Sequence, residues 1–261
     1  MKLKALNIVC SQTELSKIPD GKVLINTINA HSYNTAQKDE AFAEALRTVH
    51  GSRFTVNDKT VCVKFLIPDG ASIVKACRWL KAKSQPKERI AGWDLFSFEM
   101  KRLAGRCKKD DVRCKVMFLG SSEKVLALIQ ERATVDYPNL EVVTYSPPYK
   151  SEFSEEDNQA MIQAINKANP DLLWIGMTAP KQEKWTYQHW KELDIHCHVG
   201  TIGAVFDFYA GTVRRAPLWW QKHSMEWLYR LLFEPKRIWR RYVIGIPLFL
   251  WNILKEKLGM K

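Results

Sequence analysis

Polar residues and glycines cluster in five short loops. Each loop lies at the end of an apolar, strand-like run or shortly after it. Asp69 stands between a proline and a glycine, and a carboxylate in such a place can act as a general base for a hydroxyl nucleophile. Loops that open a helix also offer backbone N–H groups to a phosphate. We therefore expect one site built from five loops, which are Thr27-Ile28-Asn29, Pro68-Asp69-Gly70, Gly120-Ser121-Ser122, Pro180-Lys181-Gln182-Glu183 and Gly200-Thr201-Ile202-Gly203.

Each candidate residue also has a structural interpretation, and the local sequence leaves both open. Asp69 fits a type I or II turn as well as a general base. Gly120-Ser121-Ser122 fits a serine helix N-cap as well as a phosphate loop, and it lacks the G-x-G-x-x-G pattern of a dinucleotide site. Asp207 follows a strand-like apolar run over 204–206, and it fits hydrogen bonding to a ribose or a base as well as a turn cap.

The sequence gives little support to a metal site. His196 and His198 would share one face of a strand while Cys197 faces away, and no further ligands stand nearby. The chain also contains no D-x-D, the acidic pair with which many nucleotide-sugar enzymes hold a divalent ion. We therefore expect no metal and no cofactor.

Strands that alternate with helices must position these loops. Near-continuous apolar strands in such an alternation are typical of a mainly parallel sheet covered on both faces, so the predicted class is α/β and Rossmann-like. Ligands of such sheets bind outside the carboxyl ends of the strands. Ser154 and Asp157 form a relaxed capping box that starts one helix. The other predicted elements are strands over 23–28, 61–67, 114–119, 140–145, 171–177 and 195–199, and helices over 35–50, 72–83, 123–132 and 182–193.

Composition bounds the class of protein further. The 261 residues are 46% hydrophobic and 26% charged, which suffices for a sizeable core and is too apolar for a disordered chain. Six cysteines without a C-x-x-C exclude a disulfide-built scaffold and a zinc ribbon. We expect a cytosolic protein with reduced thiols, in which Cys62, Cys77, Cys107 and Cys114 pack as small apolar side chains.

The net charge of +12 predicts an anionic partner, and the charge is unevenly distributed. Residues 212–261 hold eleven Lys and Arg against three Glu, which gives +8, and five of the ten Trp. We therefore expect an α/β domain over 1–211 and a basic, Trp-rich helical appendage over 212–261. No secretory signal is recognised, and the longest apolar stretch, 243–254, is shorter than the about 20 residues that span a bilayer.

Three interpretations of the basic, aromatic appendage remain open. Trp and Tyr suit the headgroup level of a membrane, and Arg suits a lipid phosphate or a pyrophosphate. Aromatic residues interleaved with Arg also suit nucleic acid, because both can stack on bases. A helical hairpin packed on the domain with a solvated basic face needs no ligand. We favour contact with a membrane or a lipid phosphate.

Taken in order, the motifs resemble those of the WecG/TagA/CpsF family of bacterial glycosyltransferases. The resemblance covers about residues 23–257 and rests on eight motifs in the right order rather than on any single one. The motifs are Thr27-x-Asn29; Pro68-Asp69-Gly70 with Ile73-Val74; Arg89-x-x-Gly92-x-Asp94-Leu95; Phe118-Leu119-Gly120; Ser146-Pro147-Pro148 with Glu152-Phe153; Pro180-Lys181-Gln182-Glu183; Val199-Gly200 through Phe206-Asp207 to Ala210-Gly211; and Arg215-Ala216-Pro217 with the segment 226–235.

The resemblance implies an enzyme that moves a sugar from a UDP-sugar to a polyprenyl-diphosphate-linked sugar, with inversion and without a metal. The donor would be UDP-N-acetylmannosamine, its uronic acid, or another UDP-hexose or uronate. The product would belong to a cell-surface polysaccharide such as a teichoic acid linkage unit, a common antigen or an exopolysaccharide. The appendage would dock on the cytoplasmic face of the membrane, without nucleic acid as a partner, and the chain could self-associate.

The resemblance also implies roles for individual residues. Asp69 matches the family's proposed catalytic base, with Thr27 beside it and Gln182 in the same pocket. Arg89 and Gln182 would face the pyrophosphate and sugar of the donor, Asp207 would lie on the nucleotide side, and arginines of the appendage would reach phosphates. The implied substrate-binding residues are Asn29, Arg89, Asp94, Gly120, Ser121, Lys181, Gly200, Gly203, Asp207, Arg215, Arg230 and Arg237.

The sequence departs from the common family pattern in two places, and two rival functions remain. Gly120-Ser121-Ser122 and Gly200-Thr201-Ile202-Gly203 stand where many members have paired glycines, which leaves the precise donor open. The first rival is a basic nucleic-acid-binding α/β protein, whose affinity would depend steeply on salt. The second is a nucleotide-sugar-binding scaffold without turnover.

Overall fold

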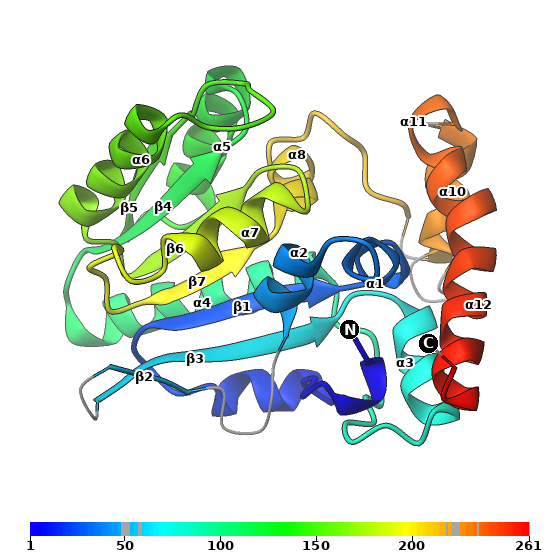
Figure 1. The fold of residues 1–261 in the computed structure, drawn as a ribbon. Helices are drawn as coiled ribbons and strands as arrows, with labels where there is room; N and C mark the ends of the chain where they lie inside the picture. The colour runs from blue at the N-terminus through cyan, green and yellow to red at the C-terminus, as the bar shows by residue number, and fades with distance from the viewer. Residues whose placement is uncertain (48–52, 57–58, 218, 221–224, 234, 261) are drawn as a thin grey trace.

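Seven strands form one central sheet in the computed structural model (Figure 1). They are β1 (Val23–Ile28), β2 (Arg53–Val56), β3 (Lys59–Pro68), β4 (Cys114–Gly120), β5 (Leu140–Tyr145), β6 (Leu172–Gly176) and β7 (His198–Thr201). Their order is β2-β3-β1-β7-β6-β4-β5, with β2 antiparallel to β3 and the other neighbours parallel. The structure describes residues 1–47, 53–56, 59–217, 219–220, 225–233 and 235–260, without the side chains of 53–63, 230, 237 and 238.

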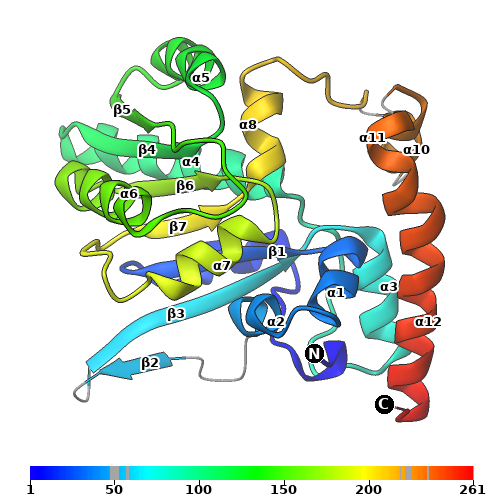
Figure 2. The same ribbon diagram turned by 45° about the horizontal axis from the view of Figure 1, so that its top comes forward.

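Helices cover both faces of the sheet, which confirms the predicted α/β class (Figures 1 and 2). They are α1 (Ala30–Ala36), α2 (Glu40–Leu46), α3 (Ala71–Trp79), α4 (Gly92–Asp110), α5 (Glu123–Asp136), α6 (Glu155–Ala168), α7 (Lys181–Gln188), α8 (Gly203–Tyr209), α10 (Glu226–Phe233), α11 (Pro235–Trp239) and α12 (Gly245–Leu258), with short helical turns η1 (Leu3–Ala5), η2 (Gln12–Lys17) and η3 (Arg240–Ile244). Side chains alternate along β1, so Val23 and Ile25 pack with α4, α5 and α8, whereas Leu24 packs with α6 and the α7 side.

The connection between β1 and β2 differs from the sequence prediction. In place of one helix over 35–50 there are two short helices, because two polar residues each start a helix of their own. The Asn29 side chain accepts a hydrogen bond from Ser32 N at 3.0 Å and begins α1. The Asp39 side chain accepts one from Phe42 N at 3.0 Å and begins α2. The single-helix prediction is wrong because the apolar period masked these caps.

Other differences concern the type or the ends of elements. The strand-like run 204–206 lies in helix α8, where Val205, Phe206 and Tyr209 are buried at helical spacing. Strand β7 begins at His198 rather than at residue 195, and α7 ends at Gln188 rather than at residue 193. The sequence did not predict the edge strand β2 or the long helix α4, whereas the Ser154–Asp157 capping box of α6 is confirmed.

The C-terminal helix α12 shares a buried core with the N-terminal segment and α1 (Figures 1 and 2). Phe249 and Ile253 of α12 are almost fully buried against residues of α1 and α3. Glu256 accepts hydrogen bonds from Leu3 N at 2.9 Å and Lys4 N at 2.7 Å. It also accepts one from the Tyr33 hydroxyl at 2.6 Å, so one carboxylate joins the two ends of the chain.

Within the part of the chain that the structure describes, no helix combines the length and the apolarity that crossing a bilayer requires. The amphipathic helix α10 and the partly exposed helix α12 instead lie along one flank of the molecule (Figure 1). The lateral position of these helices follows from the core that α12 shares with α1.

The cysteines give one correction to the sequence analysis. Cys107 at the end of α4 and Cys114 at the start of β4 form a disulfide, so the expectation that both are reduced is wrong. The turn between the two elements brings their Cα atoms to 5.9 Å, which lies within the normal range for a disulfide. Both residues are buried as expected, and so is Cys77, which is free. The side chain of Cys62 lies outside the described residues.

We expect Glu256→Gln to lower the free energy of unfolding by about 3 kcal/mol, because an amide offers one acceptor oxygen to three donors and adds a buried N–H₂ group. Urea denaturation followed by circular dichroism measures this change. The exposed Glu131→Gln on α5 is the matched control and should shift stability by less than about 0.5 kcal/mol. Equal midpoints for the two variants would contradict the role of Glu256 in joining the chain ends.

Candidate active site

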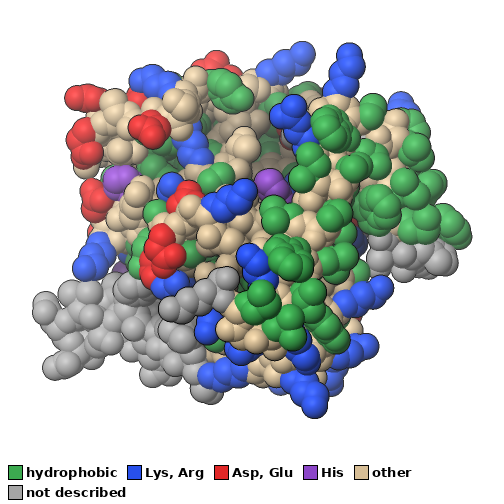
Figure 3. All heavy atoms as spheres, turned by 45° about the vertical axis from the view of Figure 1, so that its right-hand side comes forward, with side chains coloured by type: hydrophobic (Ala, Val, Ile, Leu, Met, Phe, Trp, Pro, Cys, Tyr) green, Lys and Arg blue, Asp and Glu red, His purple; other side chains and the backbone are tan. Residues whose placement is uncertain are grey.

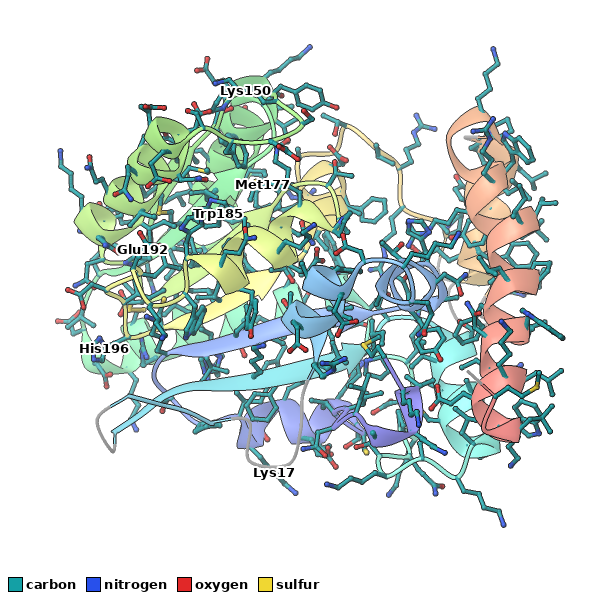
Figure 4. The ribbon with its side chains drawn as sticks, viewed as in Figure 1. Lys17, Lys150, Met177, Trp185, Glu192 and His196 are labelled. Atoms are coloured by element: carbon teal, nitrogen blue, oxygen red, sulfur yellow. A yellow bond between two sulfur atoms is a disulfide. The ribbon has the colours of Figure 1, made fainter. Side chains whose placement is uncertain are left out.

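A cleft of about 1920 Å³ opens at the carboxyl ends of the central strands, between the sheet and the C-terminal helices. Each of the five loops predicted from the sequence contributes at least one residue to its lining. Met177, which follows β6, marks this edge in Figure 4, whereas His196 and Glu192 lie at the opposite edge. Parallel pairing explains the gathering, because it places the carboxyl ends of β1, β3, β6 and β7 side by side.

Asp69 lies where β3 turns into α3, and its position is fixed by the neighbouring strand. Its backbone N–H donates to Ile28 O at 2.8 Å, at the end of β1. Gly70 follows with a φ of 147°, a conformation that side chains rarely adopt, and starts α3. Burial raises the pKa of the Asp69 carboxyl, the charges of Arg89 and Arg241 lower it, and that of Glu226 raises it. A raised pKa makes the carboxylate a stronger base.

The two ends of the Asn29 side chain have different partners. Its Oδ1 accepts hydrogen bonds from His31 N and Ser32 N, both at 3.0 Å, and so caps α1. With the oxygen occupied, the amide end faces Asp69, and its hydrogen bond lowers the pKa of that carboxyl. Thr27 lines the cleft two residues before Asn29, opposite Ile67 in the register of β1 and β3. The structure thus places Thr27, Asn29 and Asp69 together.

The arginines of the cleft come from the body and from the C-terminal segment. Arg89 is held beside Asp69 because the next residue, Ile90, donates its N–H to Pro68 O at 3.0 Å. The Nη1 of Arg89 pairs with Glu226 Oε2 of α10 at 3.1 Å. Arg215 lies with its guanidinium 5.2 Å from the centre of the Trp93 ring. Arg241 also lines the cleft, and its charge lowers the pKa of Asp69. These three cations lie around Asp69, and two of them also approach other carboxylates, Arg89 that of Glu226 and Arg215 that of Asp94.

Gln182 and Glu183 form a buried pair at the start of α7. Gln182 Oε1 accepts from Met177 N at 3.1 Å, and Gln182 Nε2 donates to Glu183 Oε1 at 2.8 Å. Glu183 is 2% exposed, and its Oε2 is buried without a hydrogen-bond partner among the described residues. Burial raises the pKa of Glu183 to about 7, and the hydrogen bond from Gln182 opposes this shift. The two residues therefore form a buried, hydrogen-bonded part of the cleft lining.

Three of the glycines in the predicted site mainly permit close packing. A Cβ on Gly203 would lie 2.4 Å from Met177 O and 2.9 Å from Gln182 Oε1, so glycine lets α8 approach the buried pair. A Cβ on Gly200 would lie 2.2 Å from the Trp174 ring, and one on Gly120 would lie 2.3 Å from Gly176 O. Gly203 lines the cleft, whereas Gly120 and Gly200 do not.

The remaining predicted residues are placed as follows. Ser121, Lys181 and Asp207 line the cleft. The Ser121 N–H donates to Gly176 O at 3.0 Å, so this amide is not free for a phosphate, and Ser122 is the N-cap of α5. Asp94 caps α4 through Ala91 N at 2.8 Å and lies 4.0 Å from Arg215 instead of lining the cleft. Arg230 and Arg237 belong to α10 and α11, and their side chains lie outside the described residues.

The histidine pair examined as a metal candidate lies away from the cleft. His198 begins β7, and its ring nitrogen lies 3.2 Å from Glu99 Oε1 and close to Arg102 at the opposite edge of the sheet. In the described part of the chain, no three His, Cys, Asp or Glu side chains gather in a group that could hold a metal ion. The His198 ring instead forms hydrogen bonds with Arg102 and with Pro19 O, both at 2.9 Å, beside the ion pair of Arg102 with Glu99.

Sequence reasoning missed two residues of the site, which are Glu226 and Arg241, and it gave no individual role to a third, Glu183. Glu183 stands inside a quoted motif directly after Gln182, so a signal for it was present in the sequence. Glu226 and Arg241 lie on the C-terminal helices, and only the packing of those helices places them beside Arg89 and Asp69. Charge on an amphipathic helix shows which residues are polar, but not which of them face a cleft.

Fold and site together define a class of protein. Doubly wound sheets bind ligands outside the carboxyl ends of their strands, and here that edge offers a carboxylate suited to proton transfer and arginines suited to phosphate. Residues 6–261 match the sequence profile described as the Glycosyl transferase WecG/TagA/CpsF family. The chain belongs to this family and is a glycosyltransferase.

Curated relatives share most of the chain. A protein of Bacillus subtilis is 28% identical over 238 residues, which cover 91% of this chain and 81% of the relative. A protein of Bacillus spizizenii is 31% identical over 193 residues, covering 74% and 69%. A protein of Staphylococcus aureus is 28% identical over 240 residues, covering 92% and 82%. Each is named an N-acetylglucosaminyldiphosphoundecaprenol N-acetyl-beta-D-mannosaminyltransferase.

The buried Glu183 carboxyl predicts a specific dependence of stability on pH. Its pKa rises from an ordinary 4.5 to about 7 on folding, so the folded state binds the proton more tightly. The free energy of unfolding should therefore fall by up to about 3 kcal/mol as the pH rises from 4.5 to 7. In Glu183→Gln the part of the decline that this carboxyl causes should be absent, so stability should fall with pH less steeply than in the wild type. Urea denaturation of both proteins at several pH values measures the difference.

The control for this prediction is Glu192→Gln, which changes a carboxylate that bonds His189 at the opposite edge of the sheet. It should retain the decline of the wild type. A Glu183→Gln protein whose stability falls with pH as steeply as that of the wild type would show that Glu183 titrates as an ordinary carboxyl.

Proposed function

We propose that this glycosyltransferase moves a sugar from a UDP-sugar to a sugar linked to a polyprenyl diphosphate, with inversion at the anomeric carbon and without a metal ion. The observation that carries the proposal is the cleft in which Asp69 stands among Arg89, Arg215 and Arg241. One carboxylate suits a base for the acceptor hydroxyl, and the arginines suit the diphosphates of both substrates. The names of the relatives support this acceptor class.

In the proposed step, Asp69 accepts the proton of the acceptor hydroxyl while that oxygen forms a bond to the anomeric carbon. The bond from the anomeric carbon to the diphosphate oxygen breaks, and UDP departs with the electron pair. One displacement on one carbon inverts its configuration. Burial favours this role because it raises the pKa of Asp69, while the amide of Asn29 holds the carboxylate in place. Thr27 and Gln182 would shape the pocket around the reacting carbon.

Arginine charge takes the place that a divalent ion has in many other glycosyltransferases. Negative charge grows on the diphosphate as the bond to the sugar breaks, and fixed cations in a dry cleft stabilise it. Arg89 and Arg215 are partly buried, with exposed fractions of 22% and 21% for their side chains, and both approach carboxylates that orient them. Lys181 at the start of α7 would add a further charge, and Asp207 would contact the nucleotide.

The names of the relatives favour UDP-N-acetylmannosamine as the first donor to test. Its uronic acid and other UDP-hexoses or uronates follow, because Ser121 and Thr201 stand in loops that differ from the common family pattern. The product would enter a cell-surface polysaccharide of the exopolysaccharide, teichoic acid linkage or common antigen type.

We further propose that residues 212–261 form an appendage that binds the cytoplasmic face of the membrane and covers the site. Hydrophobic side chains gather over the C-terminal helices, with Lys and Arg around them (Figure 3). The exposed fractions are 62% for Leu232, 69% for Phe233, 58% for Val243 and 54% for Ile244. Such a surface beside basic residues suits the interface of an anionic membrane. Self-association would be a second way to cover it.

We expect Asp69→Asn to lower the transfer rate by about 10²–10⁴-fold, because an amide cannot accept the proton, while the affinity for UDP stays within about twofold. The assay contains a short-chain lipid-diphosphate-GlcNAc acceptor, a panel of UDP-sugars and EDTA, and it follows both UDP release and the disaccharide product. Calorimetry measures UDP binding.

The matched control is Asp110→Asn at the exposed end of α4, which should retain full activity. If the wild type and the variants bind UDP but turn over none of the donors, the result would favour a scaffold over an enzyme. Binding of DNA that falls steeply with salt, together with no affinity for UDP, would favour the nucleic-acid alternative. Loss of turnover in EDTA alone would overturn the metal-independent step.

The membrane proposal predicts that the double variant Leu232→Ser and Phe233→Ser binds vesicles at least about 10-fold more weakly, because two exposed apolar side chains no longer enter the lipid. Co-sedimentation with phosphatidylglycerol/phosphatidylcholine vesicles measures the affinity. Val135→Ser on α5, where the side chain is 78% exposed, is the control and should bind like the wild type. Equal affinities for all three proteins would show that this face does not contact lipid.

A further inference from the structure

The cleft continues past Asp69 between helices α3 and α12, and its lining becomes apolar toward the end of α3. Residues 72, 75, 76 and 79 of α3 line it, at the spacing that marks one face of a helix. Residues 246, 250 and 253 of α12 supply the opposite wall at the same spacing. We name this part the α3–α12 groove, and its apolar lining residues are Ala76, Trp79, Ile246, Phe249, Leu250 and Ile253.

The α3–α12 groove has a buried floor and an exposed rim. Ala76, Phe249 and Ile253 are 6%, 1% and 2% exposed and form the floor. Trp79 and Leu250 are 49% and 60% exposed and form the rim. Because Ala76 on the floor is small and the rim residues are large, a narrow apolar channel remains between them. Exposing this channel to water costs free energy.

Hydrogen bonds fix the walls of the groove. Lys257 Nζ donates to Trp79 O at 2.7 Å and ties the end of α12 to the end of α3. Asn252 Nδ2 donates to Asn34 Oδ1 at 3.0 Å, and Asn34 Nδ2 donates to Gly245 O at 2.7 Å, so α12 is also tied to α1. The two helices lie side by side in both ribbon views (Figures 1 and 2). The groove is therefore formed before any ligand binds.

The inner end of the groove is cationic and leads to the proposed base. Lys75 is exposed on the groove face of α3, and in the described part of the chain no carboxylate lies within ion-pair distance of it. Arg241 of η3 lines the same region, and its charge lowers the pKa of both His31 and Asp69. From Asp69 outward, the cleft thus offers a base, then cations, then an apolar channel between α3 and α12, whose wall on α12 runs for roughly 10 Å from Ile246 to Ile253.

The volume of the cleft also points to a second ligand. At about 1920 Å³ it exceeds the about 300–1,000 Å³ of a cleft that serves one small molecule. The five strand-end loops supply only part of the residues that line the cleft, and the α3–α12 groove supplies another part. A donor nucleotide that binds at the strand ends leaves the groove empty.

We propose that the α3–α12 groove binds the first isoprene units of the acceptor lipid, with the diphosphate beside Lys75 and Arg241 and the terminal sugar at Asp69. The order of chemistry along the cleft matches the order of groups along such a molecule, which runs from hydroxyl to dianion to hydrocarbon. This inference rests on the proposed function, because it takes a lipid-linked acceptor as the substrate. It places the first part of the hydrocarbon chain in a groove of the protein, in addition to the contact of the chain with the membrane.

The test compares two acceptors in solution, without vesicles and below their micelle-forming concentrations. Both carry GlcNAc diphosphate, one on a hexyl chain and the other on a farnesyl chain. For the wild type, KM should be at least about 10-fold lower for the farnesyl acceptor, since more hydrocarbon enters the groove. Trp79→Ala should raise KM for the farnesyl acceptor about fivefold and leave KM for the hexyl acceptor and the affinity for UDP unchanged.

The matched control is the Leu232→Ser and Phe233→Ser variant, which alters exposed residues that do not line the cleft. In solution it should retain the full preference for the farnesyl chain, although it binds vesicles weakly. If Trp79→Ala does not fold, as judged by its thermal unfolding, Leu250→Ser on the opposite rim replaces it, with the same expected result.

The outcomes separate the groove from the proposed function. Turnover of both acceptors by the wild type with equal KM values would overturn the groove and leave the proposed function standing. An equal loss of chain preference in the control variant would overturn the groove as well, because the preference would then belong to the outer surface. No turnover of either acceptor with any UDP-sugar would overturn the proposed function, and the groove with it.

Discussion

Parallel pairing of β1 with β3 on one side and β7 on the other is the constraint on which the site depends. It places the carboxyl ends of these strands at one edge, and there the Asp69 N–H bonds to Ile28 O across the pair. The hydrogen bond brings the carboxylate of Asp69 beside Asn29, which is fixed in turn by the cap of α1. A slip of one residue in this pairing would turn the side chains to the other face of the sheet.

Electrostatic balance in the cleft follows from the packing of distant segments. Burial alone would disfavour the charged form of Asp69, and Arg89 and Arg241 oppose that effect from the body and from the C-terminal segment. Glu226 of α10 pairs with Arg89, so the C-terminal segment that brings the cation Arg241 near the base also brings a carboxylate to the neighbouring arginine. An anionic substrate that displaced Glu226 from Arg89 would gain a guanidinium already held in place.

The C-terminal segment is both part of the core and part of the cleft. Glu256 and Phe249 bind it to the N-terminal segment and α1, while Leu250 lines the cleft from the same helix. Such a helix cannot move away as a whole without exposing a buried core. Its apolar outer side and its groove side therefore keep a fixed position relative to Asp69.

The sequence by itself determined the fold class, the five strand-end loops and the family, because strand periodicity and ordered motifs are local properties. It did not determine that Asn29 caps a helix, that the run ending at Phe206 is helical, or that Cys107 and Cys114 meet, since caps and tertiary contacts override local apolar pattern. Only the tertiary structure decided that Asp94 caps α4 beside Arg215 without lining the cleft, and that Arg241 lines the cleft near Asp69. The physical reason is that the direction of a side chain depends on how its helix packs, and packing joins residues far apart in sequence.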